Sequence, residues 1–128
     1  TLSLHDALPI CWYYAEQKDF DKNSGWKDTA LVTVVNGSIV DVLWNGIYKD
    51  NSKKSKIVEA VQGRYGMAKA AKKGEWNVQA NAVEDAIVKA GDPSKIAMKA
   101  DGTSDAISGA SIHLTVVALA IEALKTAK

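Results

Sequence analysis

The sequence predicts an α+β fold in which an antiparallel sheet with an Asn-Gly hairpin packs against two main helices. Three observations predict it. β-branched residues dominate the two runs that flank Asn36-Gly37, helical periodicity extends from Trp76 to Ala90, and a long apolar run begins at Ile112. Strand-forming segments come first and helix-forming segments follow, which is typical of α+β layer folds.

Length and composition limit the chain to one globular domain. A chain of 128 residues has room for a single hydrophobic core. Its 47% hydrophobic and 24% charged residues are typical of globular proteins, and its net charge of +1 gives no general argument for binding nucleic acid or a membrane surface. No apolar run reaches the ~20 residues of a membrane span. The single cysteine excludes an intrachain disulfide and a metal site built from several thiolates.

Residues 1–10 carry no pattern that continues into the domain. They resemble the translation of a short-read sequencing adapter, so we interpret residues 1–11 as junction sequence and expect the domain to occupy residues 12–128. Cys11 is then junction sequence or an ordinary thiol, since Pro9 and Ile10 differ from the small residues of a lipoprotein cleavage site. The first expected strand is Trp12–Ala15, and we expect a native export signal to be missing.

The clearest expected element is a β-hairpin formed by Thr29–Val35 and Ser38–Trp44. Asn36-Gly37 between the two runs suits a two-residue turn that needs positive φ angles. Because side chains alternate across a strand, one face of each strand should enter the core. The expected core residues are Ala30, Val32 and Val34 on the first strand and Val40, Val42 and Trp44 on the second.

The middle of the chain is expected to alternate between loops and helices. Residues 48–56 include four lysines, which favours a solvated loop over the alternative of a phosphate-contacting patch. Ile57–Gln62 predicts a short helix that Gly63 interrupts, followed by an ordered loop to Met67. In Trp76–Ala90 the apolar residues recur at helical spacing, and Gly91 follows as a stop signal.

The final helix is expected to extend from Ile112 to Ala127 and to be the most buried helix of the domain. Only a narrow stripe of it should be exposed, made of Thr115, Ala118, Glu122 and Lys125.

The segment Asp105–Ser111 directly precedes this helix and combines hydroxyl, glycine and methyl-sized side chains. Backbone N–H groups at a helix start are unpaired and carry the positive end of the helix dipole, so they favour an anion such as phosphate. Gly109 would let the backbone approach a ligand, and Ala110 adds little bulk. The alternative is that Ser108 or Ser111 is an ordinary helix N-cap.

The same segment resembles the D-x-x-S/T-G-A-T/S motif of FMN-binding domains, the covalent flavin carriers that also occur within the sodium-pumping NADH:quinone reductase. The resemblance covers roughly Tyr13 to the C-terminus and is strongest to the short domains of membrane-anchored lipoprotein immunogens. Besides the motif, the matching blocks are Trp26–Trp44, Gly63–Met67, Glu75-Trp76, Gln79-Ala80, Asp92–Ile96 and Thr103–His113.

The resemblance implies that FMN is the cofactor and that a flavin transferase joins its phosphate to the last hydroxyl of the motif. That hydroxyl belongs to Ser111, a serine where threonine is usual in the family. The expected cofactor-binding residues of this segment are Ser111, Ala110, Gly109, Ser108, Asp105 and Ile112.

A flavin ring also needs an apolar or aromatic wall. Tyr65 and Met67 are the preferred candidates because they belong to a glycine-flanked loop, whereas Trp44 and Trp76 are expected to fill the core. His113 could contact the cofactor or lie on a helix surface.

The implied function is electron transfer by an extracytoplasmic FMN domain of a bacterial cell envelope. Its implied partners are redox proteins or quinones, with a flavin transferase for maturation, no nucleic acid, and a membrane only through a missing N-terminal anchor. FMN would pass one or two electrons, and the protein would position it. The alternative is a flavin-free surface module for binding or assembly on the same scaffold.

Overall fold

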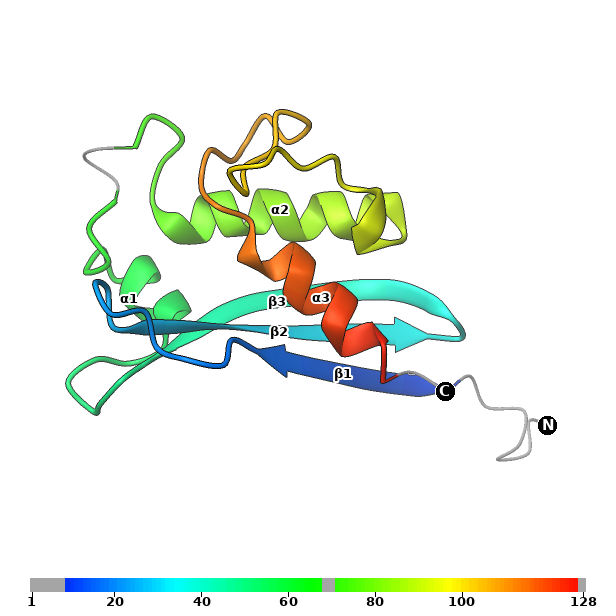
Figure 1. Cartoon of the computed structure of the whole chain (residues 1–128), viewed down its shortest axis with the longest axis horizontal. Coiled ribbons are helices and arrows are strands. Elements are labelled where there is room, and N and C mark those ends of the chain that lie inside the picture. Colours follow the sequence, from blue (N-terminus) through cyan, green and yellow to red (C-terminus); the bar gives the residue numbers. More distant parts are fainter. Residues whose placement is uncertain (1–8, 68–70, 127–128) are drawn as a thin grey trace.

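The computed structural model describes residues 9–67 and 71–126 (Figure 1). It contains a three-stranded antiparallel sheet in the order β1-β2-β3, with α2 and α3 on one side of it. This arrangement confirms the α+β class and the two main helices. The elements are β1 (Ile10–Glu16), β2 (Trp26–Val35), β3 (Ser38–Tyr48), α1 (Lys56–Val61), α2 (Trp76–Ala90), the 3-10 helix η1 (Pro93–Lys95) and α3 (Thr115–Leu124).

The predicted hairpin is present and connects β2 to β3. Asn36 and Gly37 form its turn, with φ angles of 50° and 81°, which is the left-handed geometry that this dipeptide tolerates. β1 pairs with β2 along its whole length and begins at Ile10, two residues before the expected start. Cys11 pairs with Val34, so it is part of the sheet.

A β-bulge changes which residues of β3 face the core. Thr33 pairs with Asp41 while Val34 pairs with Ile39, so Val40 has no partner in the ladder. The expectation that Val40 is a core residue is therefore wrong: its side chain is 50% exposed, and Ile39 packs against the core instead. The other residues expected in the core are buried, except Val34, which is partly buried.

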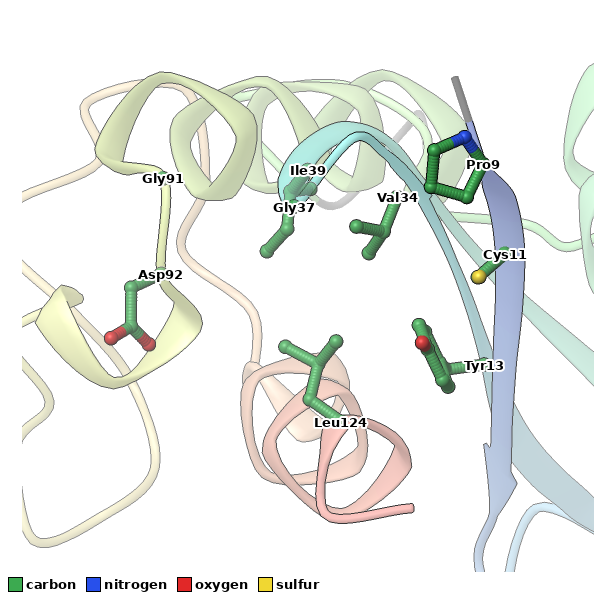
Figure 2. A pocket seen from close by; sticks show the side chains of 9 residues that line it. All are labelled: Pro9, Cys11, Tyr13, Val34, Gly37, Ile39, Gly91, Asp92 and Leu124. Carbon is green, nitrogen blue, oxygen red and sulfur yellow. The ribbon is translucent and has the colours of Figure 1, made fainter. Parts of the chain in front are cut away.

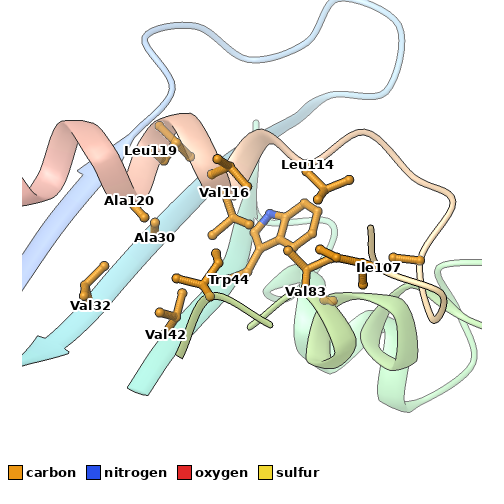
Figure 3. Packing of buried hydrophobic residues seen from close by; sticks show 14 of the residues in the cluster. Ala30, Val32, Val42, Trp44, Val83, Ile107, Leu114, Val116, Leu119 and Ala120 are labelled. Carbon is orange, nitrogen blue, oxygen red and sulfur yellow. The ribbon is translucent and has the colours of Figure 1, made fainter. Parts of the chain in front are cut away.

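The core lies between the sheet and the helices that cover it (Figure 3). α3 lies on β1 and β2, whereas α2 lies on β3. The predicted face of α2 is buried at Trp76, Ala80, Val83 and Ile87. Gly91 ends this helix with a φ of 78°, as its sequence position predicts. The buried residues of α3 are Val116, Val117, Leu119, Ala120 and Ala123.

The last helix begins later than expected, at Thr115 instead of Ile112. The backbone N–H of Leu114 donates to the carbonyl of Gly102 at 2.8 Å, and Leu114 has the non-helical angles φ −95° and ψ 62°. This contact with an upstream turn keeps residues 111–114 in a loop. Ser111 is therefore not at a helix N-terminus, and the expectation that the helix dipole stabilises an anion there is wrong.

α2 and α3 cover only one side of the sheet (Figure 1). Several large apolar residues of β1 and β3 are exposed. They include Ile10, Trp12 and Tyr14 on β1 and Leu43 and Ile47 on β3. Across the described ranges, none of the helices combines the length and the apolar character that crossing a bilayer requires.

Candidate functional site

The motif segment Asp105–Ser111 is a loop that packs against α2. A Cβ atom placed on Gly109 would lie 2.8 Å from the Cβ of Ala82, so only glycine allows the loop to come this close to the helix. Ile107 and Ala110 are buried in the core on the same side. Gly109 therefore serves the approach of the loop to α2, whereas the sequence predicted an approach to a ligand.

Ser111 is exposed and is connected to the interior through Gln79 of α2. The Oε1 atom of Gln79 accepts the Ser111 backbone N–H at 2.9 Å and the Ser111 hydroxyl at 3.3 Å. Gln79 is 0% exposed, and its Nε2 donates to the carbonyl of Gly74 at 3.1 Å. Because that donation settles which end of the amide is oxygen, the Ser111 hydroxyl directs its hydrogen inward and its lone pairs away from Gln79.

The exposed side of the motif borders a cavity of about 240 Å³, which we call the motif cavity. The Lys73 ammonium donates to the carbonyl of Ser108, and Lys99 lies 3.4 Å from the Asp105 carboxylate. The charged side chains that line the cavity are these two lysines and Asp105, so positive charge exceeds negative charge, which suits a phosphate. The residues that line the motif cavity are Lys73, Lys99, Thr103, Ser104, Asp105, Ile107, Ser108, Ala110 and Ser111.

The predicted ring-binding residues border a second cavity of about 230 Å³, which we call the aromatic cavity. Tyr65 packs between Trp26 and Trp76. Its ring centroid lies 6.0 Å from that of Trp26 and 6.2 Å from that of Trp76. The lining residues are Gln17, Asp21, Ser24, Trp26, Asp28, Trp44, Lys56, Tyr65, Met67, Trp76, Ile112, His113 and Thr115.

The predicted site residues thus divide between two cavities. Asp105, Ser108, Ala110 and Ser111 line the motif cavity, whereas Tyr65, Met67 and Ile112 line the aromatic cavity. Ile112 directly follows Ser111, so consecutive residues of one loop line the two cavities. Gly109 lines neither cavity.

The loop that carries Tyr65 and Met67 is anchored by the buried side chain of Glu75. Its carboxylate accepts the backbone N–H groups of Gly66 at 3.1 Å, Met67 at 3.0 Å and Trp76 at 2.9 Å. One side chain therefore caps α2 and holds the loop at the same time. We expect this anchor to make the Tyr65 wall rigid.

The inner wall of the aromatic cavity contains a buried ion pair that sequence analysis missed. Lys56 Nζ lies 3.0 Å from Asp28 Oδ1, and the expectation that Lys56 belongs to a solvated loop is wrong, since it is 7% exposed. Asp28 Oδ2 also accepts Trp44 Nε1–H at 3.3 Å and the Thr115 hydroxyl. One sequence signal existed: Asp28 shares the inward face of β2 with Ala30 and Val32, and a charge there needs a partner.

A further cavity, of about 510 Å³, lies at the hairpin end of the sheet (Figure 2). Figure 2 shows Cys11 and Tyr13 of β1 facing Leu124 of α3 across it. None of the predicted site residues lines this cavity. It is therefore separate from the candidate site.

Comparison with models of protein families gives no match, and comparison with curated proteins gives none either. The fold is similar to the solution NMR structure of a protein from Clostridium thermocellum, determined by the Northeast Structural Genomics Consortium, with a TM-score of 0.68. The two sequences are 44% identical over 91% of this chain and 90% of the other. The description of that protein states no activity, so the chemistry of the candidate site has to be argued from the residues of this chain. This chain belongs to the same protein family as the Clostridium thermocellum protein.

Proposed function

We propose that this domain is an electron carrier whose FMN is joined to Ser111 through a phosphoester bond. The observation that carries the proposal is the exposed Ser111 hydroxyl, which buried Gln79 orients at the border of a cavity with two lysines. A hydroxyl aligned in this way presents its lone pairs to an incoming phosphorus atom. The resemblance of Asp105–Ser111 to the FMN attachment motif supports the same residue.

The residues around Ser111 fit the parts of FMN. Lys73 and Lys99 would neutralise the phosphate, in place of the helix dipole that the sequence predicted. The aromatic cavity would receive part of the ring, with Tyr65 and Met67 on its wall. At about 230 Å³ it is smaller than the roughly 300–1,000 Å³ of typical ligand pockets, so part of the ring would remain exposed.

An exposed ring edge suits electron transfer between proteins or quinones. FMN would supply the redox chemistry, and this chain would hold it and surround it with hydrogen bonds and charge. We further propose, on the resemblance alone, that the domain works outside the cytoplasm at the cell envelope. A covalent bond there would prevent loss of the cofactor.

Attachment would require a flavin transferase and a donor in which the FMN phosphate is part of a phosphoric anhydride. The Ser111 Oγ–P bond would form, the anhydride P–O bond would break with departure of the second phosphate as the leaving group, and a base of the transferase or solvent would take the hydroxyl proton. Gln79 Oε1 holds the hydroxyl hydrogen in the resting protein, and it still accepts the Ser111 backbone N–H once the hydroxyl hydrogen is gone.

The test is co-production with a flavin transferase, followed by denaturation and gel filtration with detection of flavin absorbance. Flavin should remain with the wild-type chain and with Ser108→Ala, because Ser108 contributes its carbonyl and not its hydroxyl to the Lys73 contact. Ser111→Ala should lose it. A colourless wild-type chain would favour the alternative, a flavin-free surface module.

A further inference from the structure

Lys56 is a buried cation on the wall of the aromatic cavity. Burying a charged side chain costs free energy unless a partner compensates it, and Asp28 is that partner at 3.0 Å. The Asp28 carboxylate also receives the Trp44 indole N–H and the Thr115 hydroxyl, so donors from β3, α1 and α3 converge on it. The pair is thus part of a network that joins β2 to three other elements around the cavity.

Lys56 retains hydrogen-bonding capacity toward the cavity. An ammonium group has three N–H donors, and in the described part of the chain its only hydrogen-bond acceptor is Asp28. The Nζ atom lies 4.6 Å from the ring centroid of Trp76 and 5.3 Å from that of Tyr65. A planar ligand against these rings would therefore meet a cation on the same wall.

We infer that Lys56 favours the negatively charged, reduced form of a flavin ring bound in the aromatic cavity, and so raises its reduction potential; this rests on the proposed function. A flavin that takes up two electrons and one proton carries one negative charge, whereas the oxidised ring is neutral. A nearby cation stabilises the charged form more than the neutral one, most strongly where water is excluded. Asp28 acts through Lys56, because it holds the ammonium group at the cavity wall.

The test uses riboflavin, which lacks the phosphate, with the Ser111→Ala chain, so it does not depend on the covalent bond. Quenching of riboflavin fluorescence reports binding, and titration with dithionite against a reference dye gives the midpoint potential of bound riboflavin. Ser111→Ala should bind riboflavin, and the bound ring should be more easily reduced than free riboflavin.

Adding Lys56→Met should weaken binding of reduced relative to oxidised riboflavin by tenfold or more, a fall of about 30 mV or more in the two-electron midpoint potential. Asp28→Asn with Lys56→Met removes both charges, leaves no unpaired buried carboxylate, and should give a smaller fall in the same direction. The control Lys54→Met changes an exposed lysine two residues away and should leave the potential unchanged. Circular dichroism checks that each variant is folded.

The inference would be overturned if bound riboflavin had the same midpoint potential in Ser111→Ala and in the folded double variant Ser111→Ala/Lys56→Met. It would also be overturned if no folded variant quenched riboflavin fluorescence. Failure of the covalent bond is a separate result, since it shows only in the wild-type chain produced with the transferase. If that bond does not form but riboflavin binding depends on Lys56, the inference about Lys56 still holds.

Discussion

The carboxylate of Glu84 on α2 accepts the backbone N–H of Trp44 at 2.6 Å, on the outer edge of β3. The bond joins helix to sheet beside the core, and it places an acidic group in a partly buried position. Burial raises the pKa of Glu84 to about 7, and the negative charges of Asp41 and Asp85 add to the rise. The hydrogen bond from Trp44 opposes this shift.

Because of Glu84, the free energy of unfolding should therefore fall as the pH rises from about 4.5 through about 7. The folded chain binds the Glu84 proton more tightly than the unfolded chain does, so the stabilisation is present below the unfolded pKa and is lost above the folded one. Glu84→Gln should be more stable than wild type at pH 8 and similar to it at pH 5, by thermal melting. Glu122→Gln, an exposed control, should show no such difference; a matching pH dependence in both variants would contradict the assignment.

Glu75→Ala should destabilise the domain by about 2–3 kcal/mol, since it leaves three backbone N–H groups without their acceptor. Glu75→Gln keeps an acceptor oxygen and should lose less. Urea denaturation measures both. A loss below about 0.5 kcal/mol for the alanine variant, the range of ordinary surface changes, would show that Glu75 does not anchor the loop.

Gly109→Ala should cost about 1–3 kcal/mol, because the added methyl group would overlap the Cβ of Ala82. Ala82→Gly removes that methyl group and should recover part of the loss when the two changes are combined. Additive effects in this double-mutant cycle would mean that the loop does not pack against α2 as described.

Leu119→Ala should cost about 2–5 kcal/mol, since Leu119 is buried in the core beside the sheet. Ile121 is only partly buried, so Ile121→Ala should cost less, although the sequence predicted both residues to be buried. Chemical denaturation of the two variants measures the difference. The opposite order would show that the face of α3 is assigned incorrectly.

Local signals predicted the elements that depend on local chemistry. The Asn36-Gly37 turn needs two positive φ angles and has them, and α2 has the length that its apolar spacing and Gly91 predict. The β-bulge at Val40 has no comparable local signal, because it depends on how β2 and β3 pair.

The parts that sequence analysis missed depend on contacts between distant residues. Lys56 is buried because Asp28, on another element, faces it. The start of α3 is delayed because Leu114 bonds to Gly102, and Gln79 reaches Ser111 only once α2 and the motif loop have packed together. Helical periodicity and charge patterns do not identify such partners: the inward position of Asp28 indicates that it needs a partner, but not that the partner is Lys56.

Intact mass of the chain co-produced with a flavin transferase tests the central proposal most directly. Formation of the phosphoester adds the mass of FMN less one water, and peptide fragmentation should place it on Ser111. Ser111→Ala should keep the unmodified mass while remaining folded, since Ser111 caps no helix and its side chain bonds only to Gln79 in the described structure. An unmodified wild-type chain, or flavin on another residue, would contradict the proposal.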